Sequence, residues 1–589
     1  MLTPAQTEEL PIELEKQFRD LEQRVMSDVV RRLKLNGNDI TRSADWQINR
    51  LIELGKSQEE IKQYLANALK MSDNEIEKAY QKVIDEGYAQ NEEIYKQADK
   101  DFIPYEDNQE LQQLVSATKE QTQGEFKNIT QSLGFATKDK AGNIKFQPIA
   151  DYYQKTLDSA MLDIATGMFS YNTVLNRVVT EMTNSGLRTV DYASGWSNRV
   201  DVAARRAIMT GITQVTAKVN EDTAKDLGTN TFEVSYHSGA RPSHAEWQGG
   251  IYTYEELETV CGLGSGEGLC GWNCYHSYSP FIPGISEPTY TKQELARMKA
   301  EDAKPVDYYG KKYTKYEALQ RQRTLETRMR AQREKIKLLE EGGADEDSII
   351  TARVKYRVTS SQYAQFSKAM NLPQQRDRIY QDGKGGIGKG KWKLKNEYEK
   401  RSKDDYKNIE KTKVDFKKIE TEKWNNNFKE LTDDNNVNNS IRGVSKQLLT
   451  NRNGTFYESM YFVNAKSGKI EGFNTKSNVK LGVELNSSLR SALNNDKLDL
   501  IGIHNHPFSS VPSLSDLNAI AKRKNQSMGV VICHNGTIFT YTKPKTTIRK
   551  QDYDTALTKY KNYSKITNED KAFEFLGNLY DFEYKRLEI

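Results

Sequence analysis

A stretch poor in apolar side chains constrains this chain most, because it separates two regions that must each build their own core. Residues 376–440 contain QDGKGGIGKGKWKLKNEYEKRSKDDYKN, rich in Gly and Lys, and WNNNFKELTDDNNVNNS, rich in Asn. Such a segment has little to bury, so we predict a flexible linker. The chain has 589 residues, whereas single cores stop growing near roughly 250–300 residues. We therefore expect a multidomain protein.

Helical spacing of apolar residues dominates residues 1–230. It begins with Leu14, Phe18, Leu21 and Val25. Ser57 and Ser72 are each followed three residues later by Glu, which resembles a capping box and predicts two helix starts. Residues 291–375 are helical again, and the charged run at 316–343 predicts an exposed helix or a short coiled coil. The N-terminal region is therefore expected to be mostly α-helical.

Charge and cysteine content limit the class of protein. The 86 basic and 82 acidic residues leave a net charge of +4, so no global basic field favours nucleic-acid binding. We find no secretory signal in MLTPAQTEELPIELEKQ and no run of about 18 apolar residues that would span a membrane. Three of the four cysteines, Cys261, Cys270 and Cys274, fall within 14 residues. This favours a thiol or metal cluster in a reducing cytoplasm over a disulfide framework.

Residues 231–290 are dense in Gly, aromatic residues, Cys and His, which predicts a compact, loop-rich module. The last two clustered cysteines and His276 have the spacing C-x3-C-x-H, which lets thiolates and an imidazole converge on one zinc ion. His244 or Cys261 would be the fourth ligand. In the alternative interpretation, buried cysteines and packed histidines stabilise the module without a metal.

Alternating apolar residues appear in the C-terminal region, at residues 441–546. The segments FYESMYFVNA, LDLIGIHNH, GVVICHNG and TIFTYT predict strands, and a helix is expected between Ser513 and Lys524. These elements predict a small α+β domain. Residues 547–589 are expected to form a helical tail.

His504 and His506 lie two residues apart at the end of an apolar strand, so both imidazoles point to one face and can reach one ion. Asp516, at the start of the following helix, can turn back toward them. Two histidines and one carboxylate leave a fourth zinc position open, as in catalytic rather than structural sites. Ser513 and Asp516 also fit a plain helix N-cap with an acidic third residue. His534, in the next strand, either packs or approaches this site.

The run GKGGIGKG at 383–390 nearly matches a phosphate-binding loop. Gly390 replaces the Ser or Thr that would bind magnesium, and no apolar strand precedes the run. We interpret it as part of the linker.

Several uncommon strings occur in the order found in a known family. GARPSHAEWQG, GEGLCGWNCYH, SPFIPGISEP and YEALQRQRTLETRMR closely resemble the phage minor capsid protein 2 family, as do MLTPAQTEELP, ADWQINRLIELG and SYNTVLNRVVTEM. The resemblance runs from residue 1 to about 375. It implies a virion protein in the capsid interior or near the portal, with portal and major capsid proteins as partners and packaged DNA nearby. Before assembly it would be in the host bacterial cytoplasm.

A second resemblance concerns the C-terminal domain. His504-x-His506-Pro, followed by Ser513-x-x-Asp516, resembles the signature of JAB/JAMM (MPN) metallopeptidases, although the loop of five residues after the Pro is shorter than the family's usual loop. The resemblance implies a JAB/MPN-like fold in which His504, His506 and Asp516 bind Zn²⁺ and Ser513 helps to hold the oxyanion.

The same resemblance implies a glutamate on an earlier strand as general base. Glu458 opens the strand segment ESMYFVNA and precedes a Lys-Ser-Gly turn, so it is our choice, with Glu471 in reserve. The predicted function is therefore a phage minor capsid protein that carries a zinc peptidase or isopeptidase domain. One alternative is an effector or toxin, delivered by a phage-like particle, whose payload is the peptidase. Another is a structural protein with a catalytically inactive C-terminal interaction domain.

Overall fold

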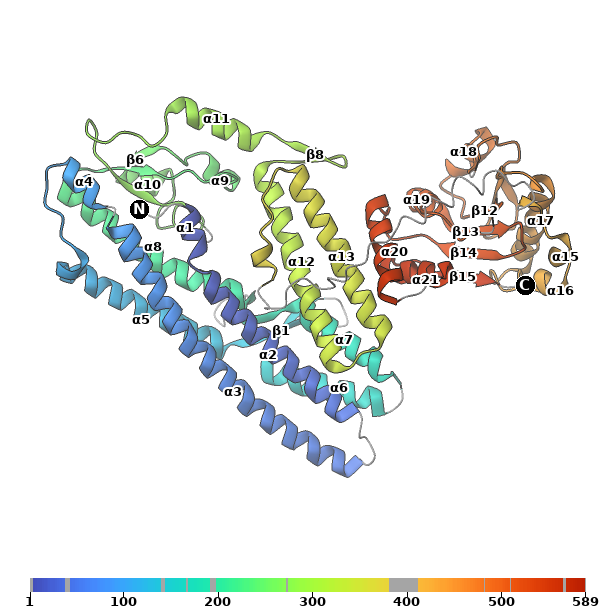
Figure 1. Cartoon of the computed structure of the whole chain (residues 1–589), viewed down its shortest axis with the longest axis horizontal. Coiled ribbons are helices and arrows are strands. Elements are labelled where there is room, and N and C mark those ends of the chain that lie inside the picture. The colour runs from blue at the N-terminus through green and yellow to red at the C-terminus, as the bar shows by residue number, and fades with distance from the viewer. Residues whose placement is uncertain are drawn as a thin grey trace. The chain divides into compact units, whose positions relative to one another are not determined.

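The structure is a computed structural model of the chain (Figure 1). It describes residues 4–37, 43–89, 91–138, 143–165, 168–190, 197–271, 274–380, 412–480, 482–508, 510–564 and 568–587. The chain divides into two compact units, one of Met1–Ile349 with Gln362–Ile387 and one of Ile350–Ser361 with Gly388–Ile589. The run at 383–390, predicted to be linker, lies outside the described residues.

Long helices build most of the N-terminal unit. They are α1 (Pro4–Glu9), α2 (Ile12–Gly37), α3 (Ser43–Lys82), α4 (Asn91–Gln97), α5 (Gln109–Gln131), α6 (Ile149–Ala165), α7 (Tyr171–Ser185) and α8 (Val200–Leu227), with a π-helix at Val83–Tyr88. Helix α2 packs against α3, α6, α7 and α8 (Figure 1). The predicted helix starts at Ser57 and Ser72 are wrong, because α3 runs through both. The Ser72 hydroxyl instead donates to the Leu69 carbonyl within that helix, at 2.7 Å.

An antiparallel sheet interrupts the region predicted to be helical. Its order is β2-β1-β3-β4, and its strands are β1 (Leu133–Lys138), β2 (Ile144–Pro148), β3 (Leu187–Val190) and β4 (Ser197–Arg199). The strands are short and lie between strongly helical segments, so period-two alternation has little length in which to appear.

Residues 292–378 return to helices. They comprise α11 (Lys292–Ala303), the hairpin β8 (Val306–Tyr308) and β9 (Lys311–Tyr313), α12 (Lys315–Gly342), α13 (Glu346–Ala369) and a 3-10 turn at Arg376–Arg378. Of the two predicted alternatives for α12, the exposed helix is wrong, because Leu325, Met329 and Ile336 are buried, and the short coiled coil stays a prediction. Gln322, Glu326 and Arg333 of the same helix are also buried, so the buried face is not purely apolar and the sequence pattern did not reveal it. No described helix has the length and apolar character needed to cross a membrane.

The Cys/His-rich segment is built on a small antiparallel sheet of order β6-β5-β7. Its elements are β5 (Thr231–Val234), α9 (Pro242–Ala245), β6 (Ile251–Thr253), α10 (Tyr254–Thr259) and β7 (Tyr278–Phe281). Phe232, Trp247 and Tyr278 share its core with Cys261 and Cys274. Few residues are in regular structure, as expected for a loop-rich module.

The C-terminal unit is α+β, with a mixed sheet of order β11-β10-β12-β13-β14-β15. The strands are β10 (Met460–Asn464), β11 (Ile470–Asn474), β12 (Leu500–His506), β13 (Gln526–Cys533), β14 (Ile538–Thr542) and β15 (Tyr584–Leu587). Only β12 and β13 are parallel, and helix α19 (Leu514–Lys522) connects them. The crossover therefore brings the start of α19 to the carboxyl end of β12.

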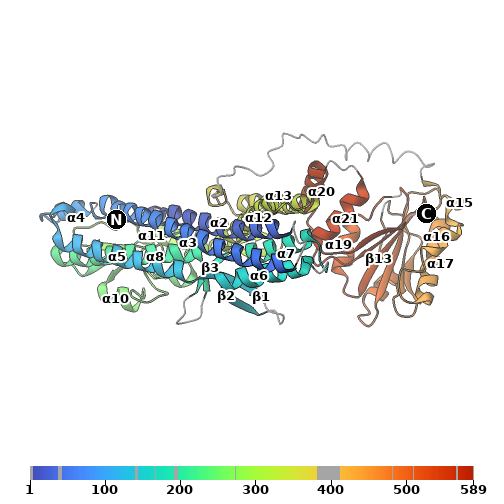
Figure 2. The same ribbon diagram turned by 90° about the horizontal axis from the view of Figure 1, so that it is seen from below.

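Apolar side chains alternate between the two faces of this sheet, so both faces pack against helices. In β13, Val530 and Ile532 pack toward α17 (Asn435–Arg452), whereas Val531 and Cys533 pack toward α19, α20 (Lys550–Ser564) and α21 (Glu569–Tyr580). Figure 2 shows the sheet between these two helical layers. A smaller cluster packs α18 (Ser487–Leu493) on β10 and β11. The histidine-bearing strand β12 is thus a central strand of a sheet that is covered on both faces.

Two segments differ from the sequence predictions. The end of the predicted linker is folded: α15 (Phe416–Ile419) and α16 (Glu422–Asn426) precede α17, and Trp424 is fully buried and donates to the Gly536 carbonyl at 2.8 Å. The predicted helical tail ends in β15, which pairs with β14. The first segment covers the sheet and the second extends its edge, and local composition reveals neither of these contacts.

Candidate metal centre

The two histidines of β12 converge as the strand period predicts. Their Nε2 atoms lie 3.2 Å apart, and both side chains are buried. Asp516 approaches from the first turn of α19, with Oδ1 3.4 Å from His504 Nε2 and Oδ2 3.6 Å from His506 Nε2. The structure therefore brings the three predicted ligands together.

Ser513 and Asp516 also form the predicted helix cap. The Ser513 hydroxyl and backbone N–H both donate to Asp516 Oδ2 at 2.7 Å, and the Asp516 N–H donates back to Ser513 Oγ at 3.2 Å. The two interpretations of this pair are thus compatible, because the capping box fixes the carboxylate that faces the imidazoles. The bond also engages the hydroxyl for which an oxyanion role was predicted.

Glu458 joins the histidines from the segment before β10. Met460 pairs with His504 in the antiparallel ladder, which brings Glu458 level with the end of β12. Glu458 is buried, and one ligand atom each from Glu458, His504 and His506 lie within 4.8 Å of one another. Glu471, the reserve candidate, instead accepts a hydrogen bond from the Asn464 amide at 3.3 Å. The geometry therefore favours Glu458.

The charges in this cluster depend on one another. Burial alone would lower the pKa of His506, but the hydrogen bond to Asp516 and the charge of Glu458 outweigh burial and raise that pKa to about 9. Burial raises the pKa of Glu458 despite the neighbouring imidazoles. Burial opposes ionisation of Asp516, yet His504 and His506 hold its pKa well below the ordinary value. The cluster is built around a negative charge at Asp516 and attracts positive charge.

Sequence reasoning missed two supporting residues. The fully buried Asn505 accepts from the Ser459 N–H at 2.8 Å and donates to the Tyr457 carbonyl, so it holds the segment that carries Glu458 against β12. Ser510 contacts His506 Nδ1 through its carbonyl at 3.0 Å and its hydroxyl at 3.1 Å. The signal for Asn505 was a further polar residue between the two histidines, at the end of a strand that begins with apolar residues.

His534 does not join the metal-capable group. Its Nε2 lies 3.0 Å from the Asn505 amide, and its Nδ1 lies 2.6 Å from the Thr412 carbonyl. A backbone carbonyl can only accept, so Nδ1 carries the hydrogen. His534 therefore contacts Asn505 rather than the metal-capable group.

In the Cys/His-rich module, a second group converges. His244 comes from α9, and Cys274 and His276 precede β7; one ligand atom from each lies within 4.8 Å of the others, and all three side chains are buried. Burial lowers the pKa of His276 to about 3. Cys261 lies in the core of the module and is not in this group.

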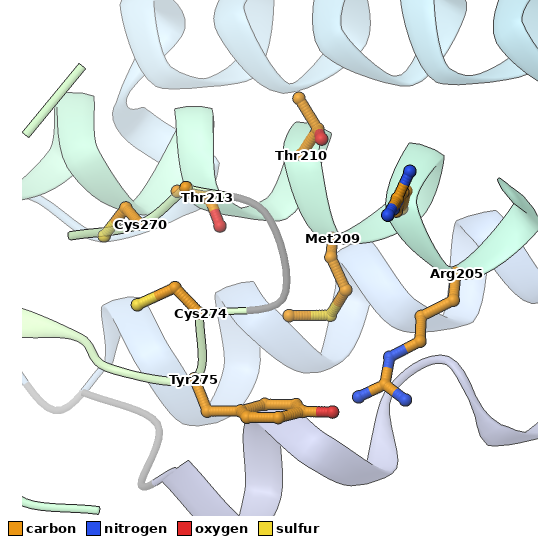
Figure 3. Close-up of a pocket in the computed structure, with 9 residues that line it drawn as sticks. Arg205, Met209, Thr210, Thr213, Cys270, Cys274 and Tyr275 are labelled. Carbon is orange, nitrogen blue, oxygen red and sulfur yellow. The ribbon is translucent and has the colours of Figure 1, made fainter. Parts of the chain in front are cut away.

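Cys270 also falls outside the group, although spacing alone predicted it as a ligand. Its φ is 60°, and its thiol donates to the His276 carbonyl at 3.7 Å. Cys270 and Cys274 line one cavity of about 20 Å³ beside helix α8, into which Met209 also projects (Figure 3). The Arg205 guanidinium lies 5.0 Å from the Tyr275 ring centre at the edge of this cavity.

Comparison with known proteins supports the first resemblance. The family model described as phage minor capsid protein 2 matches residues 2–368. No curated protein and no solved structure matches the chain.

Proposed function

The chain belongs to the phage minor capsid protein 2 family, and on that premise we propose that it is a structural component of the phage head whose C-terminal unit is a zinc-dependent peptidase. The family match supports virion association. Location in the capsid interior or near the portal, with portal and major capsid proteins as partners, is part of the proposal. Assembly would take place in the host bacterial cytoplasm. The chain should copurify with assembled heads, and its absence from purified particles would contradict this part.

The observation that carries the peptidase proposal is the convergence of His504, His506 and Asp516 beside the buried Glu458. Two imidazoles and one carboxylate suit zinc, since they leave room for further ligands. The set also has the residue types of the JAB/JAMM signature, with a shorter loop before Ser513, which makes a JAB/MPN-like fold part of the proposal. When bound, zinc would supply a Lewis acid that polarises a carbonyl and acidifies water.

Glu458 is the proposed proton carrier. Its carboxylate is buried within reach of the histidines, and its pKa is raised by that burial. A base whose pKa lies nearer the working pH transfers protons more effectively in both directions. Glu458 would take a proton from water and return it to the nitrogen of the leaving amine.

The other residues hold this arrangement. Ser513 fixes Asp516 through the capping box, Ser510 orients His506 through Nδ1, and Asn505 holds the backbone on both sides of Glu458. An oxyanion role for Ser513 remains a prediction, which would require its hydroxyl to leave Asp516. The substrate class proposed is a peptide or isopeptide bond.

The test uses the full chain loaded with zinc and offered peptide, ubiquitin-like and peptidoglycan-stem substrates. Wild type should bind zinc at this centre and cleave one class, whereas His506→Ala should lose both that zinc ion and cleavage. Retention of cleavage by His506→Ala would overturn the proposal. A wild-type chain that holds no zinc at this centre would instead favour an interaction domain without catalytic activity.

A further inference from the structure

The hydrogen bonds of two histidines in the Cys/His-rich module fix where their lone pairs point. His244 Nε2 lies 2.8 Å from the Glu267 carbonyl, which can only accept, so this nitrogen carries the hydrogen. His276 Nε2 lies 3.0 Å from Gln248 Oε1, which also accepts from the His237 N–H at 2.9 Å. That second bond identifies the atom as the amide oxygen. In both neutral rings, Nδ1 is therefore an acceptor without a hydrogen.

These two lone pairs face one another in a buried site. The Nδ1 atoms of His244 and His276 are 3.4 Å apart, and Cys274 Sγ lies 3.7 Å from the first and 3.5 Å from the second. The thiol has one hydrogen for two acceptors. One lone pair thus remains without a donor, which is unfavourable in a buried site. A cation at the centre of the three atoms removes this conflict.

The three separations also match those around a tetrahedral zinc ion. Zn–N bonds of about 2.0–2.1 Å and a Zn–S bond of about 2.3 Å place two nitrogens about 3.3–3.4 Å apart and a nitrogen and sulfur about 3.5–3.6 Å apart. The described ligand atoms are 3.4, 3.5 and 3.7 Å apart. The atoms are therefore already at coordination distance from one another.

We propose that His244 Nδ1, Cys274 Sγ and His276 Nδ1 bind a zinc ion that stabilises the module, independently of the proposed peptidase centre. A thiolate with two imidazoles selects zinc over magnesium or calcium. The Glu267 carbonyl and the Gln248 amide orient the two rings, as outer partners of zinc ligands do. The ion cross-links α9 to the segment that precedes β7.

Cobalt substitution in the full chain tests this site selectively. A thiolate ligand gives Co²⁺ a near-ultraviolet charge-transfer band, and the peptidase centre has no thiol in its ligand group. Wild type and Cys261→Ser should show the band, and zinc should displace it. Cys274→Ser should not show it. Cys261→Ser is the matched control because Cys261 is a buried thiol of the same core.

Two further variants define the ligand set. Cys270→Ser should keep the band, because the Cys270 thiol is directed to a carbonyl. Gln248→Leu should weaken cobalt binding by about 10–100-fold without removing a ligand, and Gln248→Glu, which keeps an acceptor, should recover part of it. Gln248→Leu also keeps the test decisive if Cys274→Ser does not fold. No band in wild type would overturn the site, and band loss in Cys270→Ser would overturn the three-residue ligand set.

Discussion

The two metal-capable clusters found among the described residues use the same imidazole chemistry for different functions. In the N-terminal unit, His244 and His276 face one thiol, and the second nitrogen of each ring is bound to an oxygen of the protein. In the C-terminal unit, His504 and His506 face the carboxylate of Asp516, with Glu458 buried beside them. Only the second cluster has a carboxylate that can carry a proton.

The location of each cluster leads to the same distinction. The thiol cluster joins short helices and loops in a module with few strands, where a bound ion adds cross-links that regular structure does not supply. The carboxylate cluster lies at the end of a central strand, in a sheet that is already packed on both faces. We therefore expect metal to stabilise the first region and to serve chemistry in the second.

Metal removal should separate the two regions most strongly. Structural zinc contributes about 10 kcal/mol or more in small zinc domains, so chelation should expose the backbone amides of residues 231–290. The C-terminal sheet should keep its protection, because its core is complete without an ion. Hydrogen exchange of the full chain, with and without a chelator, measures both regions at once. Equal loss of protection in residues 231–290 and in the C-terminal sheet would contradict the expected difference between the two regions.

Loss of the proposed base should affect rate and leave metal in place. Glu458→Gln keeps the size of the side chain but removes proton transfer, which should lower kcat by about 10²–10⁴-fold. Zinc content should not change. Glu471→Gln is the matched control, since Glu471 accepts from Asn464 and is not one of the residues clustered around the two histidines. Equal kcat values for Glu458→Gln and wild type would exclude Glu458 as the base.

Removal of the buried Asn505 amide, which supports the C-terminal cluster, should have a smaller effect. Asn505→Leu leaves the buried Ser459 N–H without its partner, at about 1–3 kcal/mol, and removes the donor to the half-buried Tyr457 carbonyl. Denaturant unfolding should show this loss in the C-terminal unit, together with a lower kcat because the Glu458 segment is less well held. Unchanged stability would show that water replaces the amide at no cost.

The smallest expected effect concerns the cap of α19. Ser513→Ala removes the N-cap hydroxyl, which should lower the free energy of unfolding by about 1 kcal/mol, and should weaken zinc binding because Asp516 loses a donor. Ser515→Ala, an exposed position in the same turn, should change neither. If the two variants have the same unfolding free energy and zinc affinity, the capping box does not position Asp516.

Local sequence rules were sufficient to predict part of the candidate metal centre in the C-terminal unit. His504 and His506 share a face because of the strand period, and Asp516 turns toward them because of a helix cap, so their meeting could be predicted within 13 residues of sequence. Glu458 is brought to them by the pairing of Met460 with His504, a register that no local pattern fixes. Its selection from the sequence therefore depended on a family resemblance.

Other features depended on tertiary structure and could not be predicted. Spacing treats Cys270 and Cys274 alike, but the positive φ of Cys270 accompanies a thiol that is directed elsewhere. Trp424 lies in an Asn-rich segment that composition marks as linker, yet it covers the sheet. Strand β15 forms because it pairs with the edge of β14. In each case a distant partner decides the local structure.

Counting zinc ions on the intact chain tests the central claim of two centres with separate roles most directly. Native mass spectrometry of the full chain should detect two zinc ions in wild type, and one each in His506→Ala and Cys274→Ser. The ion lost in His506→Ala should be the one needed for cleavage. A wild-type chain with fewer than two ions, or a single variant that loses both, would contradict the account.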